Sequence, residues 1–305
     1  MDRPPQDAGR WPPEREPSPA VTVPGLVAQH VLDAELAALL WIMVEGNVPL
    51  VAVAAEPDDA PRTLLEAFLE LLPPVAKRLD LRGAGETFDW LGDAAALGWE
   101  VPEPALALPA ARPAPPETTY LVAGELAADD PGALSGIAVR TLVRALQRGY
   151  GLAATIRADS LQQVLVRLGA PPASLEPDEL RRLGIVLVMR RLAPGLAGEA
   201  DLAGWRVMAC HYVRPLERDV AGHLQRRPPA ILATLDPARD ALEHFEWGVT
   251  AELAMRVGLA RDEFEYEHLQ RSRLIAALVA SGRTSREVLE TLRARRSGPR
   301  TGGDA

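Results

Sequence analysis

The residues that could do chemistry stand at the ends of apolar segments. Arg62 and Thr63 lie between a strand-like run, residues 49–54, and a helical pattern, residues 64–72. Proteins often bind a nucleotide phosphate at a strand, loop and helix in this order, because N–H groups at the helix start face the anion. Arg62 and Thr63 could hold an anion there. Glu125 ends another apolar run, and acids at strand ends often bind or catalyse when the rest of a site is present.

The loop before residue 64 lacks the residues that bind phosphate. Such a loop needs glycines, whose N–H groups turn toward phosphate oxygens, and a lysine that reaches the outer phosphates. Aligned without a gap, Ala55 and Ala60 replace the two glycines and Pro61 replaces the lysine. A shift by one residue aligns Arg62 with the lysine and Thr63 with the magnesium-binding hydroxyl residue, but again supplies no glycines. Neither alignment restores the site.

The charges in the loop also argue against phosphate binding. Asp58 and Asp59 place carboxylates where a triphosphate would lie, and Pro61 has no N–H to donate. Two like charges about 4 Å apart cost about 4 kcal/mol at a surface-like dielectric. The chain's one lysine, Lys77, lies outside the loop. We therefore expect no cofactor, and ATP with Mg²⁺ only if Arg62 and Thr63 form an unusual site.

Composition limits the remaining possibilities. The chain has 305 residues, 48% of them hydrophobic, and a net charge of −9 from 42 acidic and 33 basic residues. Its arginines are scattered, which argues against a nucleic-acid surface. With one cysteine, Cys210, a disulfide framework is excluded. No stretch approaches the ~20 apolar residues of a membrane span, so we expect a cytoplasmic protein.

No familiar catalytic or metal-binding pattern is present among the other polar residues. His211, His223, His244 and His268 show no metal-ligand spacing, so no metal site is predicted. Neither a Ser/His/Asp nor a Cys/His nucleophile set can be assembled.

The elements that must position the candidate residues alternate along the chain. A helical pattern at 33–45, with Asp33 as its N-cap candidate and Gly46 as its stop, leads to the first strand. Apolar strand-like runs at 49–54, 120–123, 151–156 and 185–189 are separated by further helical patterns. Near-continuous apolar strands of this kind predict an α/β fold, with a mostly parallel sheet and helices on both faces. Residues 205–213 and 230–235 alternate and predict antiparallel strands, and residues 250–295 predict two or three helices.

These patterns predict four regions. They are a disordered, proline-rich arm at 1–23, an α/β core at 24–215, a small β subregion with C-terminal helices at 216–295, and a disordered tail at 296–305.

The order of motifs resembles the hexameric traffic ATPases of type II and type IV secretion and of type IV or tight-adherence pilus assembly, which have a RecA-like P-loop core. An apolar helix, residues 35–41, precedes the loop, and residues 120–125 resemble the Walker B strand that ends in Gly-Glu. The resemblance implies that Glu125 corresponds to the acid that polarises the attacking water. Residues 151–160 resemble the strand of the family's histidine box, and residues 164–168, the pair Pro171-Pro172 and residues 185–190 follow in the family's order. This ordered series is the most specific part of the match.

The departures from the family fall where the chemistry would be. Arg157 stands in place of the family's histidine, and Ala127 and Ala128 replace the arginine-glycine pair that usually follows the Walker B glutamate. No room is left before residue 33 for the family's large N-terminal domain. We therefore expect a degenerate member without ATP hydrolysis.

Structural roles compete with functional ones at these positions. Glu125 is either a vestigial catalytic acid or the partner of an arginine or a helix cap. Arg157 could contact a phosphate or a neighbouring subunit, or pair with Asp159 or Glu125. Asp159 and Ser160 match the start of a helix, with Ser160 as its N-cap.

Two alternatives remain open from the sequence. One is a noncanonical ATP hydrolase that uses Arg62, Thr63 and Glu125. The other is an interaction module that docks through residues 250–295 and has no nucleotide role. If the resemblance holds, the partners are a secretion or pilus ATPase, a membrane platform protein and further copies of the chain, at the inner face of the cytoplasmic membrane.

Overall fold

The computed structural model describes residues 21–100, 113–127, 132–192, 202, 204–218, 221–283, 288 and 292. The predicted tail at 296–305 and residues 1–20 of the predicted arm lie outside this range. At the end of the predicted arm, Val23 is buried and begins the first helix, α1.

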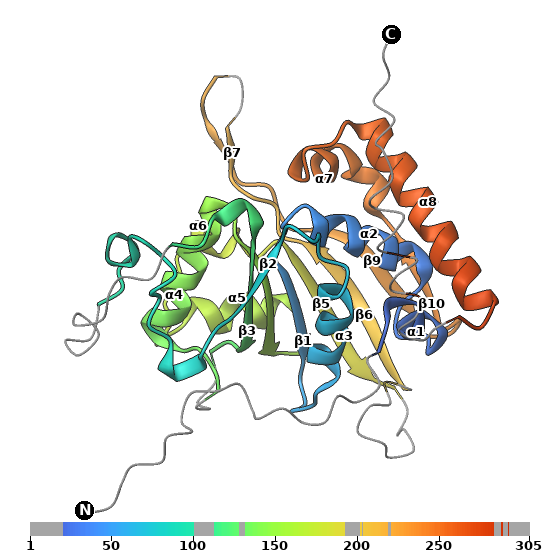
Figure 1. Cartoon of the computed structure of the whole chain (residues 1–305), viewed down its shortest axis with the longest axis horizontal. Coiled ribbons are helices and arrows are strands. Elements are labelled where there is room, and N and C mark those ends of the chain that lie inside the picture. Colours follow the sequence, from blue (N-terminus) through green and yellow to red (C-terminus); the bar gives the residue numbers. More distant parts are fainter. Residues whose placement is uncertain are drawn as a thin grey trace, which may run out of the picture.

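An 8-stranded sheet forms the centre of the molecule, in the order β10-β9-β6-β5-β1-β4-β3-β2 (Figure 1). The run from β5 to β2 is parallel, whereas β6, β9 and β10 pair antiparallel to their neighbours. The strands are β1 (Leu50–Ala54), β2 (Lys77–Asp80), β3 (Thr119–Glu125), β4 (Gly151–Arg157), β5 (Ile185–Arg191), β6 (Trp205–Tyr212), β9 (Ala230–Asp236) and β10 (Ala241–His244).

Helices cover both faces of this sheet. Alternate side chains of β1 belong to different apolar clusters, with Leu50 and Ala52 in one and Val51 and Val53 in the other. Helices α1 (Val23–Ala28), α2 (Ala34–Glu45), α3 (Ala60–Leu69), α7 (Thr250–Arg256) and α8 (Arg261–Ala280) contribute to the first cluster, and α4 (Gly136–Ala145), α5 (Leu161–Gly169) and α6 (Pro177–Leu180) to the second. The predicted α/β fold class is confirmed, and the architecture is consistent with a RecA-like core.

Short 3-10 turns complete the described elements. They are η1 (Gly83–Gly85), η2 (Ala94–Leu97), η4 (Pro116–Thr118), η5 (Leu146–Arg148) and η6 (Glu246–Gly248). Among the described residues, no helix combines the length and the apolar character needed to cross a membrane.

Helix α2 begins and ends where its sequence predicts. The Asp33 carboxylate accepts a hydrogen bond from the N–H of Leu36 at 2.9 Å, and Gly46 caps the other end. Every residue from Leu36 to Val44 is buried, as expected of a helix that is apolar on all sides. One side of α2 lies toward the sheet, and α8 packs on it from outside.

The chain after β5 extends the main sheet. The antiparallel strands predicted at 205–213 and 230–235 are β6 and β9, which pair with each other. Part of the predicted β subregion therefore continues the central sheet, while β7 (Glu217–Arg218) and β8 (Leu224–Gln225) form a separate two-stranded ribbon. The region boundaries drawn from the sequence stay predictions.

Candidate functional site

The predicted site residues lie at one edge of the sheet because they follow parallel strands. In the sheet, β4 lies between β1 and β3, and Ala54 at the end of β1 is in register with Arg157 at the end of β4. Glu125 at the end of β3 pairs with Thr155, beyond an irregularity in the register. Ligands of α/β proteins bind outside the carboxyl ends of such strands. The loop after β1, Glu125 and Arg157 therefore share the edge where a nucleotide would be expected.

In the loop after β1, the carboxylate of Asp58 forms a hydrogen bond with the start of the following helix. Oδ1 of Asp58 accepts a hydrogen bond from the N–H of Ala60 at 2.8 Å, where α3 begins. Pro61, the next residue of the helix, has no N–H. The first N–H groups of a helix attract anions. At α3, the Asp58 carboxylate occupies the place of such an anion.

A cation from another strand meets the same carboxylate. Nη2 of Arg191, at the end of β5, lies 3.4 Å from Oδ2 of Asp58. The guanidinium also stacks over the ring of Trp205, with its central carbon 5.4 Å from the ring centroid. The ion pair is partly exposed and contributes little energy by itself. Its effect is that Arg191, at the end of β5, faces a carboxylate of the loop.

The two candidate residues on α3 make contacts within the protein. The Thr63 hydroxyl donates to the carbonyl of Asp59 at 3.0 Å, and the Thr63 N–H donates to the same oxygen at 2.8 Å. Burial lowers the pKa of Arg62, and the nearby carboxylates of Glu66 and Asp59 oppose that shift. The charges around Arg62 also include Arg78 and Asp80 of the edge strand β2. The charged neighbours of Arg62 therefore come from α3, from Asp59 just before α3, and from β2.

Glu125 and Arg157 are brought together. Nη2 of Arg157 donates to Oε2 of Glu125 at 2.8 Å, and the Glu125 side chain is 22% exposed. Of the contacts that the sequence leaves open for Arg157, the structure shows the pair with Glu125. The other carboxylate oxygen, Oε1, is buried and has no hydrogen-bond partner among the described residues. Ser160 caps α5 through a hydrogen bond from the N–H of Gln163, so its predicted N-cap role is confirmed.

A second cluster was not predicted. Glu35, His244 and Glu246 each offer a ligand atom, and these atoms lie within 4.8 Å of one another. The sequence positions of Glu35, His244 and Glu246 did not indicate that these residues would meet. His244 also contacts Asp33, which lies 211 residues before it. The Asp33 cap was visible in the sequence, but the histidine that it meets was not.

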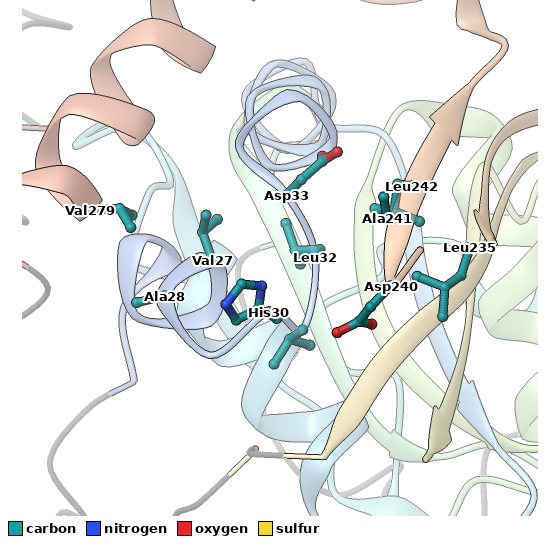
Figure 2. Close-up of a pocket in the computed structure, with 11 residues that line it drawn as sticks. Val27, Ala28, His30, Leu32, Asp33, Leu235, Asp240, Ala241, Leu242 and Val279 are labelled. Carbon is teal, nitrogen blue, oxygen red and sulfur yellow. The ribbon is translucent and has the colours of Figure 1, made fainter. Parts of the chain in front are cut away.

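A cavity of about 350 Å³ is lined in part by Asp33, which also contacts His244 (Figure 2). It lies between the turn from α1 to α2 and the hairpin from β9 to β10, with Val279 of α8 at its rim. Figure 2 shows Asp33 at one end of the cavity, its carboxylate turned away from His30 and Asp240. The described residues that line the cavity include none of the residues predicted to bind nucleotide.

Comparisons with known proteins give limited information. No family model matches this chain. An uncharacterized protein of Methanocaldococcus jannaschii, MJ1287, is 26% identical over 176 residues, which cover 55% of this chain and 61% of that protein. The X-ray structure of the Legionella pneumophila ATPase DotB is similar over 92% of this chain and 67% of that chain, at 9% sequence identity and a TM-score of 0.34.

The matched segment spans less than two thirds of MJ1287, and at its TM-score the likeness to DotB supports no functional conclusion. The function is therefore inferred from the geometry. In this α/β chain, the edge expected for a nucleotide carries a loop capped by Asp58 and an acid paired with Arg157.

Proposed function

We propose that this chain is a catalytically degenerate relative of the secretion and pilus-assembly ATPases that binds no ATP and acts as a structural or regulatory partner of such a machine. The observation that carries the proposal is the position of Asp58, which accepts from the N–H of Ala60 and pairs with Arg191. The chain's own carboxylate occupies the helix start where a phosphate would bind.

The energy of this arrangement opposes nucleotide binding. A phosphate at the start of α3 would have to displace Asp58 from both partners or accept its charge at close range. One such repulsion costs about 4 kcal/mol at 4 Å and a surface-like dielectric. Micromolar affinity corresponds to only about 8 kcal/mol. With Asp59 adjacent and no N–H at Pro61, the loop lacks the donors that would offset the repulsion.

The pairing of Glu125 supports the absence of hydrolysis. An acid that polarises a water molecule needs its carboxylate directed at that water. Here Oε2 of Glu125 accepts from Arg157.

One observation favours a second candidate, a noncanonical ATP hydrolase using Arg62, Thr63 and Glu125: Oε1 of Glu125 is buried and lacks a partner among the described residues.

The partner role rests on the family resemblance and on exposed apolar side chains. Trp247 is 76% exposed beside the start of α7, and Met255 on α7 is 64% exposed. Contiguous exposed apolar patches mark surfaces that bind other proteins, and these two side chains would form part of such a patch. A secretion or pilus ATPase, a membrane platform protein and further copies of the chain are the partners that the resemblance suggests.

Titration calorimetry with Mg-ATP tests the proposal. The native chain should give no binding heat at millimolar nucleotide. The variant Asp58→Gly/Pro61→Lys, which removes the carboxylate and adds a loop lysine, is the comparison, and Asp59→Gly serves as the matched control for charge alone. Micromolar binding to the native chain, with ATP hydrolysis abolished by Glu125→Gln, would establish the second candidate instead.

A further inference from the structure

Three acidic residues surround His244 where α2, β10 and η6 meet. Glu35 lies in the first turn of α2, His244 ends β10, and Glu246 begins η6. Nε2 of His244 is 3.9 Å from Oε2 of Glu35, and Nδ1 is 3.7 Å from Oε2 of Glu246. These distances are too long for good hydrogen bonds. The groups are close together without being bonded to each other.

Asp33 fixes the orientation of the imidazole. Its Oδ2 lies 2.8 Å from Nε2 of His244, while its Oδ1 caps α2 through the N–H of Leu36. When the neutral ring donates its Nε2 proton to Asp33, Nδ1 carries the lone pair and faces Glu246. Metal-binding histidines are held in this way, with one ring nitrogen donating to a carboxylate and the other free for the metal.

Two buried atoms of the cluster lie 3.7 Å apart and are not hydrogen bonded within the described part of the chain. Nδ1 of His244 and Oε2 of Glu246 form no hydrogen bond among the described residues. Glu246 is only 8% exposed. A buried, unbonded carboxylate oxygen is costly unless an ion or water satisfies it. Both atoms point to a missing cation between them.

The charge balance also favours a cation. Three carboxylates, on Asp33, Glu35 and Glu246, face one imidazole, so the group stays negative even when the ring is protonated.

One further group faces the cluster from α8. His268 is near enough to influence the charges of Glu35 and Glu246, and its Nε2 contacts the backbone carbonyl of Glu35 at 2.9 Å. Because that ring nitrogen is engaged with the backbone, we do not count His268 among the ligands.

We propose that Glu35, His244 and Glu246 bind a divalent transition-metal ion of the zinc class, with Asp33 as the positioning residue of the histidine. One imidazole nitrogen and two carboxylate oxygens are ligands that zinc accepts, whereas Mg²⁺ and Ca²⁺ prefer oxygen alone. The Glu35 side chain is 48% exposed, so a fourth position is open to water. The ion would join the start of α2 to β10 and to the turn before α7. This inference is independent of the proposed function.

Zinc titration of the metal-free full-length chain tests the site. We expect one equivalent of Zn²⁺ to bind with micromolar or tighter affinity in calorimetry, and Mg²⁺ at millimolar concentration not to compete. Glu246→Gln should weaken Zn²⁺ binding at least tenfold. Asp33→Asn keeps a good helix cap and should weaken binding about 10-fold to 100-fold, the usual effect of removing such a positioning carboxylate.

Glu243→Gln is the matched control because Glu243 lies on β10 beside His244 but contacts Arg239. It should leave zinc affinity within twofold of the native value. If Glu246→Gln fails to fold, as judged by circular dichroism, Glu35→Gln at the exposed end of the cluster replaces it. Absence of zinc binding to the native chain, or binding unchanged in the folded ligand variants, would overturn the proposal and leave an imidazolium held by carboxylates.

Discussion

Glu125 and Arg157 face each other across neighbouring strands of the sheet, with Oε2 and Nη2 2.8 Å apart. The strands are parallel, so both residues emerge at the same edge. An active hydrolase needs a carboxylate that is free to polarise a water molecule, whereas Oε2 of Glu125 is engaged in a salt bridge.

Breaking this salt bridge should cost modest stability. Arg157→Met leaves the mostly buried Glu125 carboxylate unpaired, and we expect the free energy of unfolding to fall by about 1 kcal/mol, since the arginine is 44% exposed and screened by solvent. Urea denaturation of Arg157→Met, Glu125→Gln and the double variant measures the coupling. Arg190→Met, at an exposed position of β5, is the control. Additive effects would mean that the two side chains do not interact.

Removing the charge of Asp58 should open the start of α3 to anions. Asparagine can still accept from the N–H of Ala60, while Arg191 loses its carboxylate partner. Sulfate at roughly five times its dissociation constant should then stabilise Asp58→Asn by about 1 kcal/mol, visible as a higher melting temperature. Asp59→Asn is the control. Equal stabilisation of the native chain by sulfate would show that Asp58 does not block the loop.

Arg271 should be important for holding α8 on α2. Its guanidinium lies 4.7 Å from the centroid of Trp41, and Nη1 is 2.8 Å from Oε2 of Glu45 in a pair whose side chains are 13% and 17% exposed. Breaking so buried a pair should cost about 3 kcal/mol. We expect Arg271→Met to lower the free energy of unfolding by that amount and to speed amide exchange in α8.

The exposed Arg273 on the same helix supplies the control for Arg271. Arg273→Met should change stability by less than about 0.5 kcal/mol. Equal effects of the two substitutions would contradict the role given to Arg271.

The ion pair between Arg144 and Glu179 should make stability depend on acid pH. Burial raises the pKa of Glu179, but hydrogen bonds from Arg144 and from the N–H of Glu176 outweigh it, and the pKa ends below the ordinary glutamate value of 4.5. The folded state therefore binds the proton less readily than the unfolded state. The stabilisation is complete above pH 4.5 and is lost as the pH falls through the folded-state pKa.

Unfolding free energies measured from pH 3 to pH 7 test this expectation. Glu179→Gln should be less stable than the native chain at neutral pH and should flatten the acid limb of the profile. Asp178→Asn, which alters the exposed pair with Arg226, is the control and should change the profile less. A native profile that Glu179→Gln leaves unchanged would contradict the assignment.

Local patterns predicted the elements of this fold well. Continuous apolar runs identified the parallel strands, and Asp33 with Gly46 marked the ends of α2. The pairing of Glu125 with Arg157 was one of the alternatives open from the sequence, because both residues end strands that the pattern makes parallel. These predictions need only short-range information and the geometry of a parallel sheet.

Contacts between distant segments could not be predicted. Asp58 and Arg191 are 133 residues apart, and their meeting depends on β5 lying next to β1. His244 and Asp33 meet because β10 ends beside the start of α2, which follows from the order of the antiparallel strands. Periodicity fixes which face of a strand is buried, but not which strand becomes its neighbour.

The burial of α2 on all sides has a consequence for synthesis. His268 of α8 lies 233 residues after its contact, Glu35 of α2. At ordinary rates of translation, roughly 5–20 residues per second, the apolar outer surface of α2 remains without its cover for more than ten seconds. During this time the nascent chain exposes the apolar surface of α2, so the cell's chaperones should bind it until α8 leaves the ribosome.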